Sequence, residues 1–348
     1  MPDDTAVPRR RFGRREKRLL GGAAMAAVVA VVFVLVLPRI ADYRDVWDVI
    51  RELGWEDAVL LAVATLLNLA TFPPSWMAAL PGLRYRQALV MTQASTALSI
   101  VSPAGAAVGM AGSYSMLRSW GFPPSAVGLA VAVSGIWNQL ANLTFPIVAL
   151  ALLTYEGQDH PALRTAALVG MVVLAVVLGA FALALSSPRR ARRIGDLAAR
   201  LVGRAKRLVH RSPVAWGGND VAHFRSRTLV LLERRWHVIT AATLVGHLNV
   251  FVLLLVCLRA VGVSDSEVSW VEAFAAWALV RILGAIPLTP GGIGVVELGL
   301  TAALVAFGAS NADAVATTLL YRALTVLPTL VLGLLAATTW RTHHPGTT

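Results

Sequence analysis

Apolar residues in this sequence occur in long runs that short polar or charged segments separate. Runs of about 20 residues match the length of a helix that crosses the hydrocarbon core of a membrane. Six runs predict full spans, at about 19–37, 58–80, 126–153, 162–185, 237–258 and 314–339. The first run is too long for a signal-peptide core and lacks a small-residue cleavage site, so we expect it to be retained. The pattern predicts an all-α polytopic membrane protein.

One further apolar stretch, 281–297, is interrupted. Its middle holds two prolines and three glycines, at Pro287, Pro290, Gly291, Gly292 and Gly294. Proline removes a backbone donor and disturbs a helix, and glycine permits backbone angles that other residues avoid. Unpaired backbone groups are tolerated at membrane depth only beside protein or water. We therefore predict a re-entrant helical hairpin over 273–308 that lines a cavity. An ordinary kink between two packed helices is the alternative.

A second interrupted stretch, 88–117, is weakly apolar and breaks at Pro103, Ala104 and Gly105. Eighteen residues after Pro103 and after Pro290 stands a glycine, Gly121 or Gly308, which we expect to end a half-helix. A long span follows each glycine. Because the predicted topology opens the two hairpins to opposite faces, the pattern favours an inverted repeat, which is typical of transporters. Gly105, Gly109 and Gly112 have the spacing that lets two helices approach closely.

Composition and charge place this helical chain in the membrane. Hydrophobic residues make up 57% and charged residues 14%, and the mean hydropathy is +0.67, whereas soluble domains are about a quarter charged. Most Lys and Arg lie in the arm 1–18 and the loop 186–236. This bias predicts that both termini, including the tail 341–348, are cytoplasmic. No folded basic domain and no stretch with interleaved aromatic residues follows the basic arm, so we expect no nucleic-acid partner.

The basic loop divides the chain into two membrane halves, 19–185 and 237–340. Within the loop, Ile194, Leu197 and Leu201 recur at helical spacing among arginines. This spacing is typical of a basic amphipathic helix on the inner leaflet. A solvated helical linker fits the same pattern. The single cysteine, Cys257, excludes an internal disulfide and a cysteine-based metal cluster.

Three ionisable residues within the second half's apolar segments are the candidate site: Arg281, Glu297 and Arg322. An intramembrane charge indicates function by default, and an arginine fork suits phosphate. Because buried charges require partners, Glu297 is also expected to pair with one of the two arginines. Helix N-termini near 104–107 and 291–294 would favour an anionic group.

Other polar residues carry less specific chemistry. We expect His247 to be a hydrogen-bonded core histidine rather than a proton relay, and Asp265–Glu267 to be a solvated turn rather than a metal site. We predict no metal and no cofactor. No nucleotide-binding loop is present, so any uphill transport would draw on an ion gradient or a partner.

The segment from Pro287 to Glu297, the later Gly308, and Leu320-Tyr321-Arg322 resemble the lysylphosphatidylglycerol synthase transmembrane (flippase-like) family, which includes the membrane part of the multiple peptide resistance factor. The matching positions are Pro290, Gly291, Gly292, Gly294, Glu297 and Arg322. Many members have a basic and an acidic residue after the first proline, where this chain has alanine and glycine at 104–107. The resemblance implies a bacterial inner-membrane protein that handles phospholipids or lipid-linked headgroups.

These observations predict a multi-pass protein of the bacterial plasma membrane that binds and translocates anionic phospholipids or lipid-linked headgroups. The residues expected at the headgroup are Arg281, Glu297, Arg322, Gly291, Gly292 and Gly294, and the hairpin breaks are Pro103, Gly105, Pro287 and Pro290. No catalytic motif is present and nothing after Thr339 is long enough for a synthase domain, so we expect no enzyme activity. A membrane-embedded lipid-modifying transferase and a non-transporting partner subunit are the alternatives, and homo-oligomerisation stays open.

Overall fold

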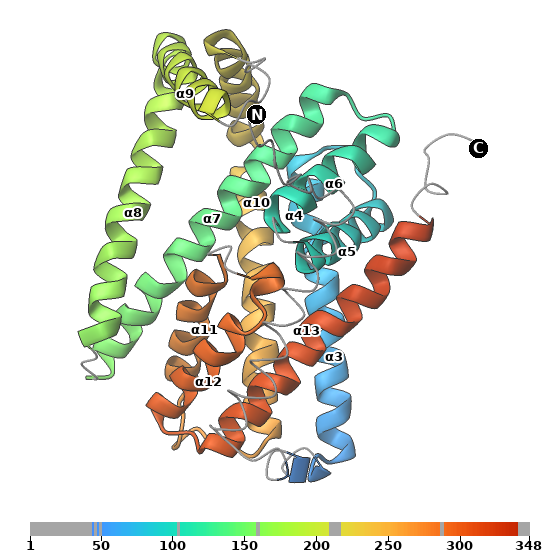
Figure 1. Ribbon diagram of the computed structural model, residues 1–348, viewed down its shortest axis with the longest axis vertical. Helices are drawn as coiled ribbons and strands as arrows, with labels where there is room; N and C mark the ends of the chain where they lie inside the picture. Colours follow the sequence, from blue (N-terminus) through green and yellow to red (C-terminus); the bar gives the residue numbers. More distant parts are fainter. Residues whose placement is uncertain are drawn as a thin grey trace, which may run out of the picture.

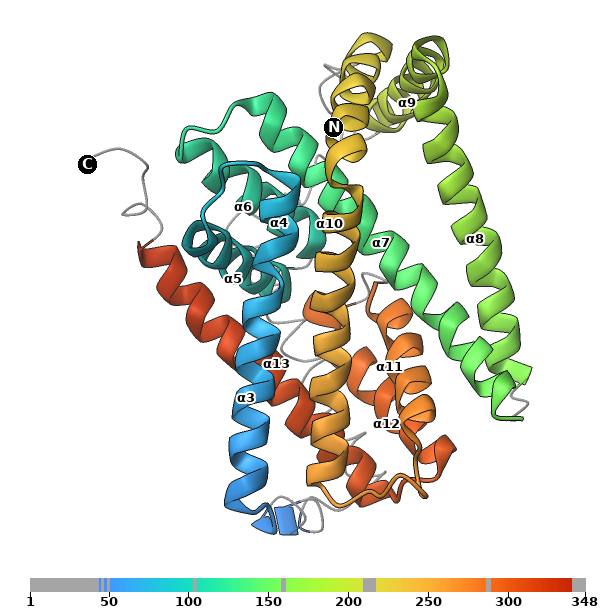
Figure 2. The same cartoon turned by 180° about the vertical axis from the view of Figure 1, so that it is seen from behind.

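The computed structural model describes residues 44, 47–48, 51–102, 105–157, 161–208, 217–285 and 289–339. Every regular element in these residues is helical, which confirms the all-α class (Figures 1 and 2). In chain order the helices are α3 (Trp55–Thr71), α4 (Pro73–Ala79), α5 (Tyr85–Val101), α6 (Gly105–Ser119), α7 (Pro124–Tyr155), α8 (Pro161–Ser186), α9 (Pro188–Leu208), α10 (Gly218–Ala260), α11 (Trp270–Ala285), η3 (Pro290–Gly292), α12 (Val295–Phe307) and α13 (Asn311–Thr339). The arm 1–18, the predicted span 19–37 and the tail 341–348 lie outside the described residues.

Four helices in the described part of the chain are long and apolar enough to cross a membrane. They are α3 continued by α4, α7, α10 and α13, and the pair of α8 and α9, which is bent by 119°, is a fifth candidate. The chain is therefore a multi-pass membrane protein. α3 ends at Thr71 and α4 begins at Pro73, since proline is tolerated in the first turn of a helix.

Each interrupted stretch forms two helices that pack against each other, α5 with α6 and α11 with α12. Glycines make this packing close. A Cβ on Gly109 of α6 would lie 2.8 Å from the carbonyl oxygen of Ser95 on α5, and one on Gly299 of α12 would lie 2.9 Å from Leu283 on α11. Side chains at these glycines would force the helices apart, so the close approach predicted for the first hairpin is confirmed.

The two membrane halves of the chain pack against each other in a reciprocal way. The first helix of each hairpin packs against the long helix that follows the other hairpin, α5 against α13 and α11 against α7 (Figure 1). Gly121 and Gly308 follow the ends of α6 and α12, and their φ values are +88° and +123°. The amide after each glycine donates to a carbonyl five residues back, which is the Schellman arrangement. Both predicted half-helix ends are thus confirmed.

Apart from Ser187 and Gly217, the described residues of the basic loop 186–236 are helical, and this corrects one predicted boundary. α10 does not begin at His237; it runs unbroken from Gly218 for 43 residues, about 65 Å at 1.5 Å per residue. That length is about twice the hydrocarbon thickness of a bilayer. α9 packs beside the first turns of α10, at one end of the molecule (Figure 2).

An aromatic cluster forms the core where α7, α10 and α11 meet. Phe145 on α7, Phe251 on α10, and Phe274 and Trp277 on α11 stack with ring centroids between 4.9 and 6.1 Å apart. The ring of His247 on α10 lies edge-on to Phe145, at 5.8 Å. The cluster fixes these three helices to one another and places a histidine at its margin.

Candidate functional site

The break in the second hairpin depends on three glycines. Gly291, Gly292 and Gly294 have φ values of +61°, +66° and +88°, in a region that favours glycine strongly. A Cβ on Gly291 would lie 3.1 Å from the Ile100 side chain, near the C-terminus of α5. The tip of the second hairpin therefore packs against the end of α5, beside the break in the first hairpin.

Glu297 and Arg322 fasten that tip to α13. Arg322 Nε donates to Glu297 Oε1 at 2.7 Å, and Arg322 Nη2 donates to the Gly291 carbonyl at 3.0 Å. The second carboxylate oxygen accepts the Gly294 N–H at 2.6 Å, so Glu297 also caps the N-terminus of α12. Glu297 is only 2% exposed. The sequence left open which arginine pairs with Glu297. These contacts show that Glu297 pairs with Arg322 and not with Arg281.

Arg281, on α11, lies in a different polar group. Its Nε donates to Asn142 Oδ1 of α7 at 2.9 Å, and its Nη2 donates to His247 Nδ1 of α10 at 2.7 Å. Its guanidinium also lies 5.0 Å from the centre of the Trp277 ring. Three helices thus contribute to this group, and all of its ligands are neutral.

The hydrogen bonds define the protonation of His247. A guanidinium has only donors, so His247 Nδ1 must accept from Arg281. The other ring nitrogen, Nε2, lies 2.8 Å from Asn138 Oδ1 and therefore carries the proton. Asn138 in turn donates to the Ser134 carbonyl at 2.8 Å. His247, 3% exposed, is the hydrogen-bonded core histidine that the sequence predicted.

Charge compensation differs between the two arginines. The ion pairs in the described part of the chain are Arg322 with Glu297 and Arg259 with Asp265. Arg281 has five N–H donors, of which two are used by Asn142 and His247. Its other three N–H groups meet no protein acceptor among the described residues. Arg281 thus has hydrogen-bond donors that no described protein group accepts.

The structure separates the predicted site residues into groups. Arg322, Glu297, Gly291 and Gly294 contact one another, whereas Arg281 binds elsewhere. A Cβ on Gly292 would lie 2.8 Å from Val296, so Gly292 serves the packing of the tip. Pro290 begins η3 and Gly105 begins α6, while Pro103 and Pro287 lie outside the described residues.

Sequence reasoning missed the ligands of Arg281. Asn138, Asn142 and His247 were visible as polar residues in apolar spans, and such residues usually find partners within the bundle. Asn138 and Asn142 are four residues apart and so share one helix face. That spacing was a signal for a polar patch, but nothing in it names a partner 139 residues away.

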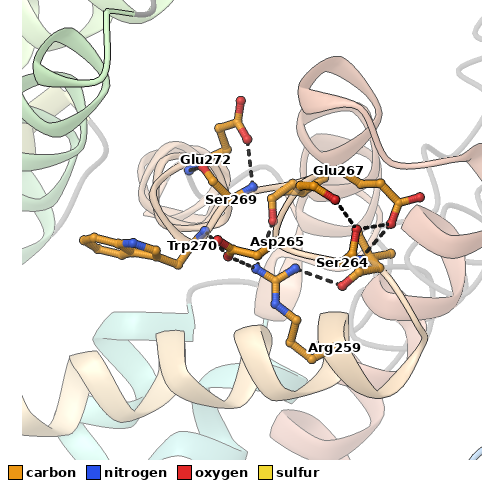
Figure 3. Close-up of polar contacts among 10 residues, drawn as sticks. Arg259, Ser264, Asp265, Glu267, Ser269, Trp270 and Glu272 are labelled. Carbon is orange, nitrogen blue, oxygen red and sulfur yellow. Dashed lines mark hydrogen bonds and ion pairs between the residues drawn. The ribbon is translucent and has the colours of Figure 1, made fainter.

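The turn between α10 and α11 positions the helix that carries Arg281 (Figure 3). Arg259, at the end of α10, donates to the Val268 carbonyl and to Asp265, and Asp265 accepts the N–H of Trp270 at the start of α11. Ser269 and Glu272 form a capping box there.

The third acid of this turn, Glu267, accepts the backbone N–H and the hydroxyl of Ser264. Those two hydrogen bonds lower the pKa of the Glu267 carboxyl. All acids of the turn therefore serve local hydrogen bonds. Asp265 and Glu267 are both exposed, and the described residues contain no group of three or more His, Cys, Asp and Glu that could hold a metal ion.

Comparison with known proteins adds a family relationship. The family model described as the lysylphosphatidylglycerol synthase TM region matches residues 23–333. A search of curated proteins returned no match. The matched range contains both hairpins and all three charged residues of the site.

Proposed function

Because this chain belongs to the lysylphosphatidylglycerol synthase TM region family, we propose that it binds phospholipids or lipid-linked headgroups and translocates them between leaflets, with Arg281 contacting the headgroup. The family ties the chain to lipid modification or translocation in a membrane. The observation that carries the narrower proposal is the state of Arg281, a partly buried cation between α7, α10 and α11 whose ligands among the described residues are all neutral.

A partly buried cation without a carboxylate partner favours an anion. Burial of an unpaired ion costs several kcal/mol even after relaxation, by order of magnitude. That cost is reduced by three neutral groups that supply no negative charge, namely Asn142, His247 and the Trp277 ring. The free N–H groups of Arg281 form a planar fork, which suits the oxygens of a phosphate. A lipid phosphate would complete both the hydrogen bonds and the charge.

The two arginines have separate roles in this proposal. Arg322 is neutralised by Glu297 and holds the hairpin tip through Gly291, so it maintains the break. Arg281 retains unused donors and takes the headgroup. The break places non-helical backbone at membrane depth. Such backbone is tolerated only where protein or a water-filled cavity surrounds it. A headgroup that crosses the bilayer needs the same surrounding.

The topology in this proposal has two re-entrant hairpins that open to opposite faces of a bacterial plasma membrane, six full spans and both termini in the cytoplasm. Contact of α5 with α13 and of α11 with α7 supports a repeat with two related halves. The chain moves lipid without modifying it, and anionic phospholipids or lipid-linked precursors are its partners.

Transport in proteoliposomes tests the proposal. Vesicles that contain fluorescent phospholipids with different headgroups receive a membrane-impermeant quencher, and the fraction of label that becomes accessible is followed in time. We expect the wild-type chain to move an anionic lipid faster than protein-free vesicles do. Arg281→Gln should remove most of this movement. Arg164→Gln, which changes an exposed arginine on α8, is the control and should behave as wild type.

Two outcomes would overturn the proposal. Wild-type vesicles that move no lipid faster than empty vesicles, with any headgroup, would exclude translocation. Equal rates for wild type and Arg281→Gln would exclude Arg281 as the headgroup contact. Mass spectrometry of the lipids after the assay completes the test, because a new covalent adduct on the lipid would favour the transferase alternative.

A further inference from the structure

α9 carries an apolar stripe that no described residue covers. Ile194, Leu197 and Leu201 are 39%, 55% and 55% exposed. At about 100° per residue they lie within a sector of about 60° of the helix surface. Ala191 and Gly195, on another face of the same helix, are buried. α9 therefore packs through its small residues and leaves its large apolar ones outside.

Specific contacts fix the direction of that stripe. The Gly218 N–H at the start of α10 donates to Asp196 Oδ1 of α9 at 2.8 Å. A Cβ on Gly195 would lie 2.9 Å from the Gly218 Cα, so the two helices touch through backbone. Arg225 of α10 donates to the Leu185 carbonyl at the end of α8, at 2.8 Å. Rotation of α9 about its axis would break these contacts.

Basic side chains lie next to the stripe. The sequence of α9 contains eight Arg and Lys and one Asp. On the helix surface Arg193, Arg200 and Arg204 follow the stripe on the side away from α10, and all three are exposed. They form no ion pair within the described chain. The exposed surface thus joins an apolar strip to an unneutralised positive strip.

The bend between α8 and α9 sets the orientation of this surface. It measures 119°, so α9 lies within about 30° of the plane perpendicular to α8. A helix that follows a membrane span in this way lies nearly along the bilayer surface. Ser187 precedes α9 and accepts the Arg190 N–H through its hydroxyl, and Pro188 begins the helix, where its missing N–H costs nothing.

We propose that α9 lies in the interface of an anionic bilayer, with Ile194, Leu197 and Leu201 among the upper acyl carbons and its arginines on lipid phosphates. An apolar strip beside a basic strip is the pattern of helices that bind anionic membrane surfaces. This site takes lipid as a surface and is separate from the single headgroup at Arg281. A soluble protein or a second copy of the chain would leave the arginines without the dense negative charge that a membrane surface supplies.

Probe accessibility in the whole protein tests this contact. The full chain with Leu201→Cys is labelled with an environment-sensitive fluorophore and placed in nanodiscs, either of phosphatidylcholine or of phosphatidylcholine and phosphatidylglycerol in equal parts. Nitroxide-bearing lipids then quench any probe that enters the bilayer. The native Cys257 is fully buried, so the unlabelled parent is a blank. Arg192→Cys is the matched control, because position 192 lies about 180° around the helix from position 201.

We expect quenching by lipid nitroxide to be at least about twofold larger at position 201 than at position 192, and larger in the anionic nanodiscs. Replacing Arg193, Arg200 and Arg204 by glutamine should remove the dependence on phosphatidylglycerol. Equal quenching at both positions would overturn the proposal. A probe at position 201 that is shielded from water but not quenched by lipid would also overturn it, because protein would then cover the stripe. Neither result bears on transport by Arg281, which the vesicle assay measures separately.

Discussion

Glu297→Gln is the most direct perturbation of the break. It removes the charge of Glu297 while keeping nearly the same shape, and one amide oxygen can still accept the Gly294 N–H. Arg322 then retains a positive charge inside the core with no carboxylate beside it. We expect this variant to unfold more easily than wild type.

The size of the effect follows from the burial of the pair. Side chains of Glu297 and Arg322 are 3% and 16% exposed. Two unit charges about 4 Å apart interact by about 4 kcal/mol at an effective dielectric constant near 20. Removal of one partner of a buried pair typically costs about 3–5 kcal/mol, because the other charge is left unpaired. Removal of both relieves that penalty, so we expect Glu297→Gln with Arg322→Gln to cost at least about 2 kcal/mol less than the sum of the two single changes.

A double-mutant cycle measures this coupling. Each variant is unfolded reversibly by titration of a denaturing detergent into mixed micelles, and helix content gives the free energy of unfolding. Arg259→Gln with Asp265→Asn supplies the control cycle in the same protein. That pair is more exposed, at 30% and 66% for the two side chains, so its coupling should stay below about 1 kcal/mol. A coupling at Glu297 and Arg322 no larger than that of the control pair would refute the role assigned to them.

The same unfolding assay checks three further predictions. Gly294→Ala should lower the free energy of unfolding by about 1–3 kcal/mol, because φ is +88° at that position. Gly128→Ala is the control and should not lower it, because a Cβ at Gly128 on α7 would meet open space. Equal losses in the two variants would argue against strain at the tip. His247→Leu should cost about 1–3 kcal/mol, because it leaves one N–H of Arg281 and the amide oxygen of Asn138 unpaired. The cost should shrink in an Arg281→Gln background. An unchanged cost would show that the bond to Arg281 contributes nothing. Hydrogen bonds from a neighbouring serine lower the pKa of Glu267 below its usual 4.5, so its contribution to stability is complete above pH 4.5 and is lost as the pH falls through the lower folded pKa. Glu267→Gln should therefore reduce the acid sensitivity of unfolding, and an identical pH profile in both proteins would contradict the hydrogen bonding of the turn.

Local chemistry explains which features the sequence could predict. Runs of apolar residues fix the positions of spans, and proline and glycine mark where a helix must break, so the ends at Gly121 and Gly308 were predictable. The start of α10 was not, because hydropathy marks the boundary of the membrane and not the end of a helix. The segment before His237 is charged yet remains helical to Gly218, since Arg and Glu are good helix formers.

Pairing between distant residues is the part that the sequence left open. Glu297 had two arginines available, and only the fold shows that Arg322 lies beside it. The three glycines that shape the tip bring the Gly291 carbonyl and the Gly294 N–H to the same ion pair, which leaves no carboxylate for Arg281. The ligands of Arg281 come from helices 34 and 139 residues away in sequence, and no local pattern specifies such a distance.

The two interrupted stretches share positions of proline and glycine but not their charges. Aligning Pro103 with Pro290 also aligns Gly121 with Gly308. In that register the first-half counterparts of Arg281, Glu297 and Arg322 are Ala94, Met110 and Gly135, none of which is charged. Buried charges are costly and indicate function by default, so an ion pair that every hairpin of this kind required would occur in both hairpins. The first hairpin closes without one, through glycine contacts between α5 and α6. A hairpin of this kind therefore needs no charge to close. The Glu297–Arg322 pair fastens the tip of the second hairpin, so Arg281 is the charge that closure does not explain, and we propose that it takes the headgroup.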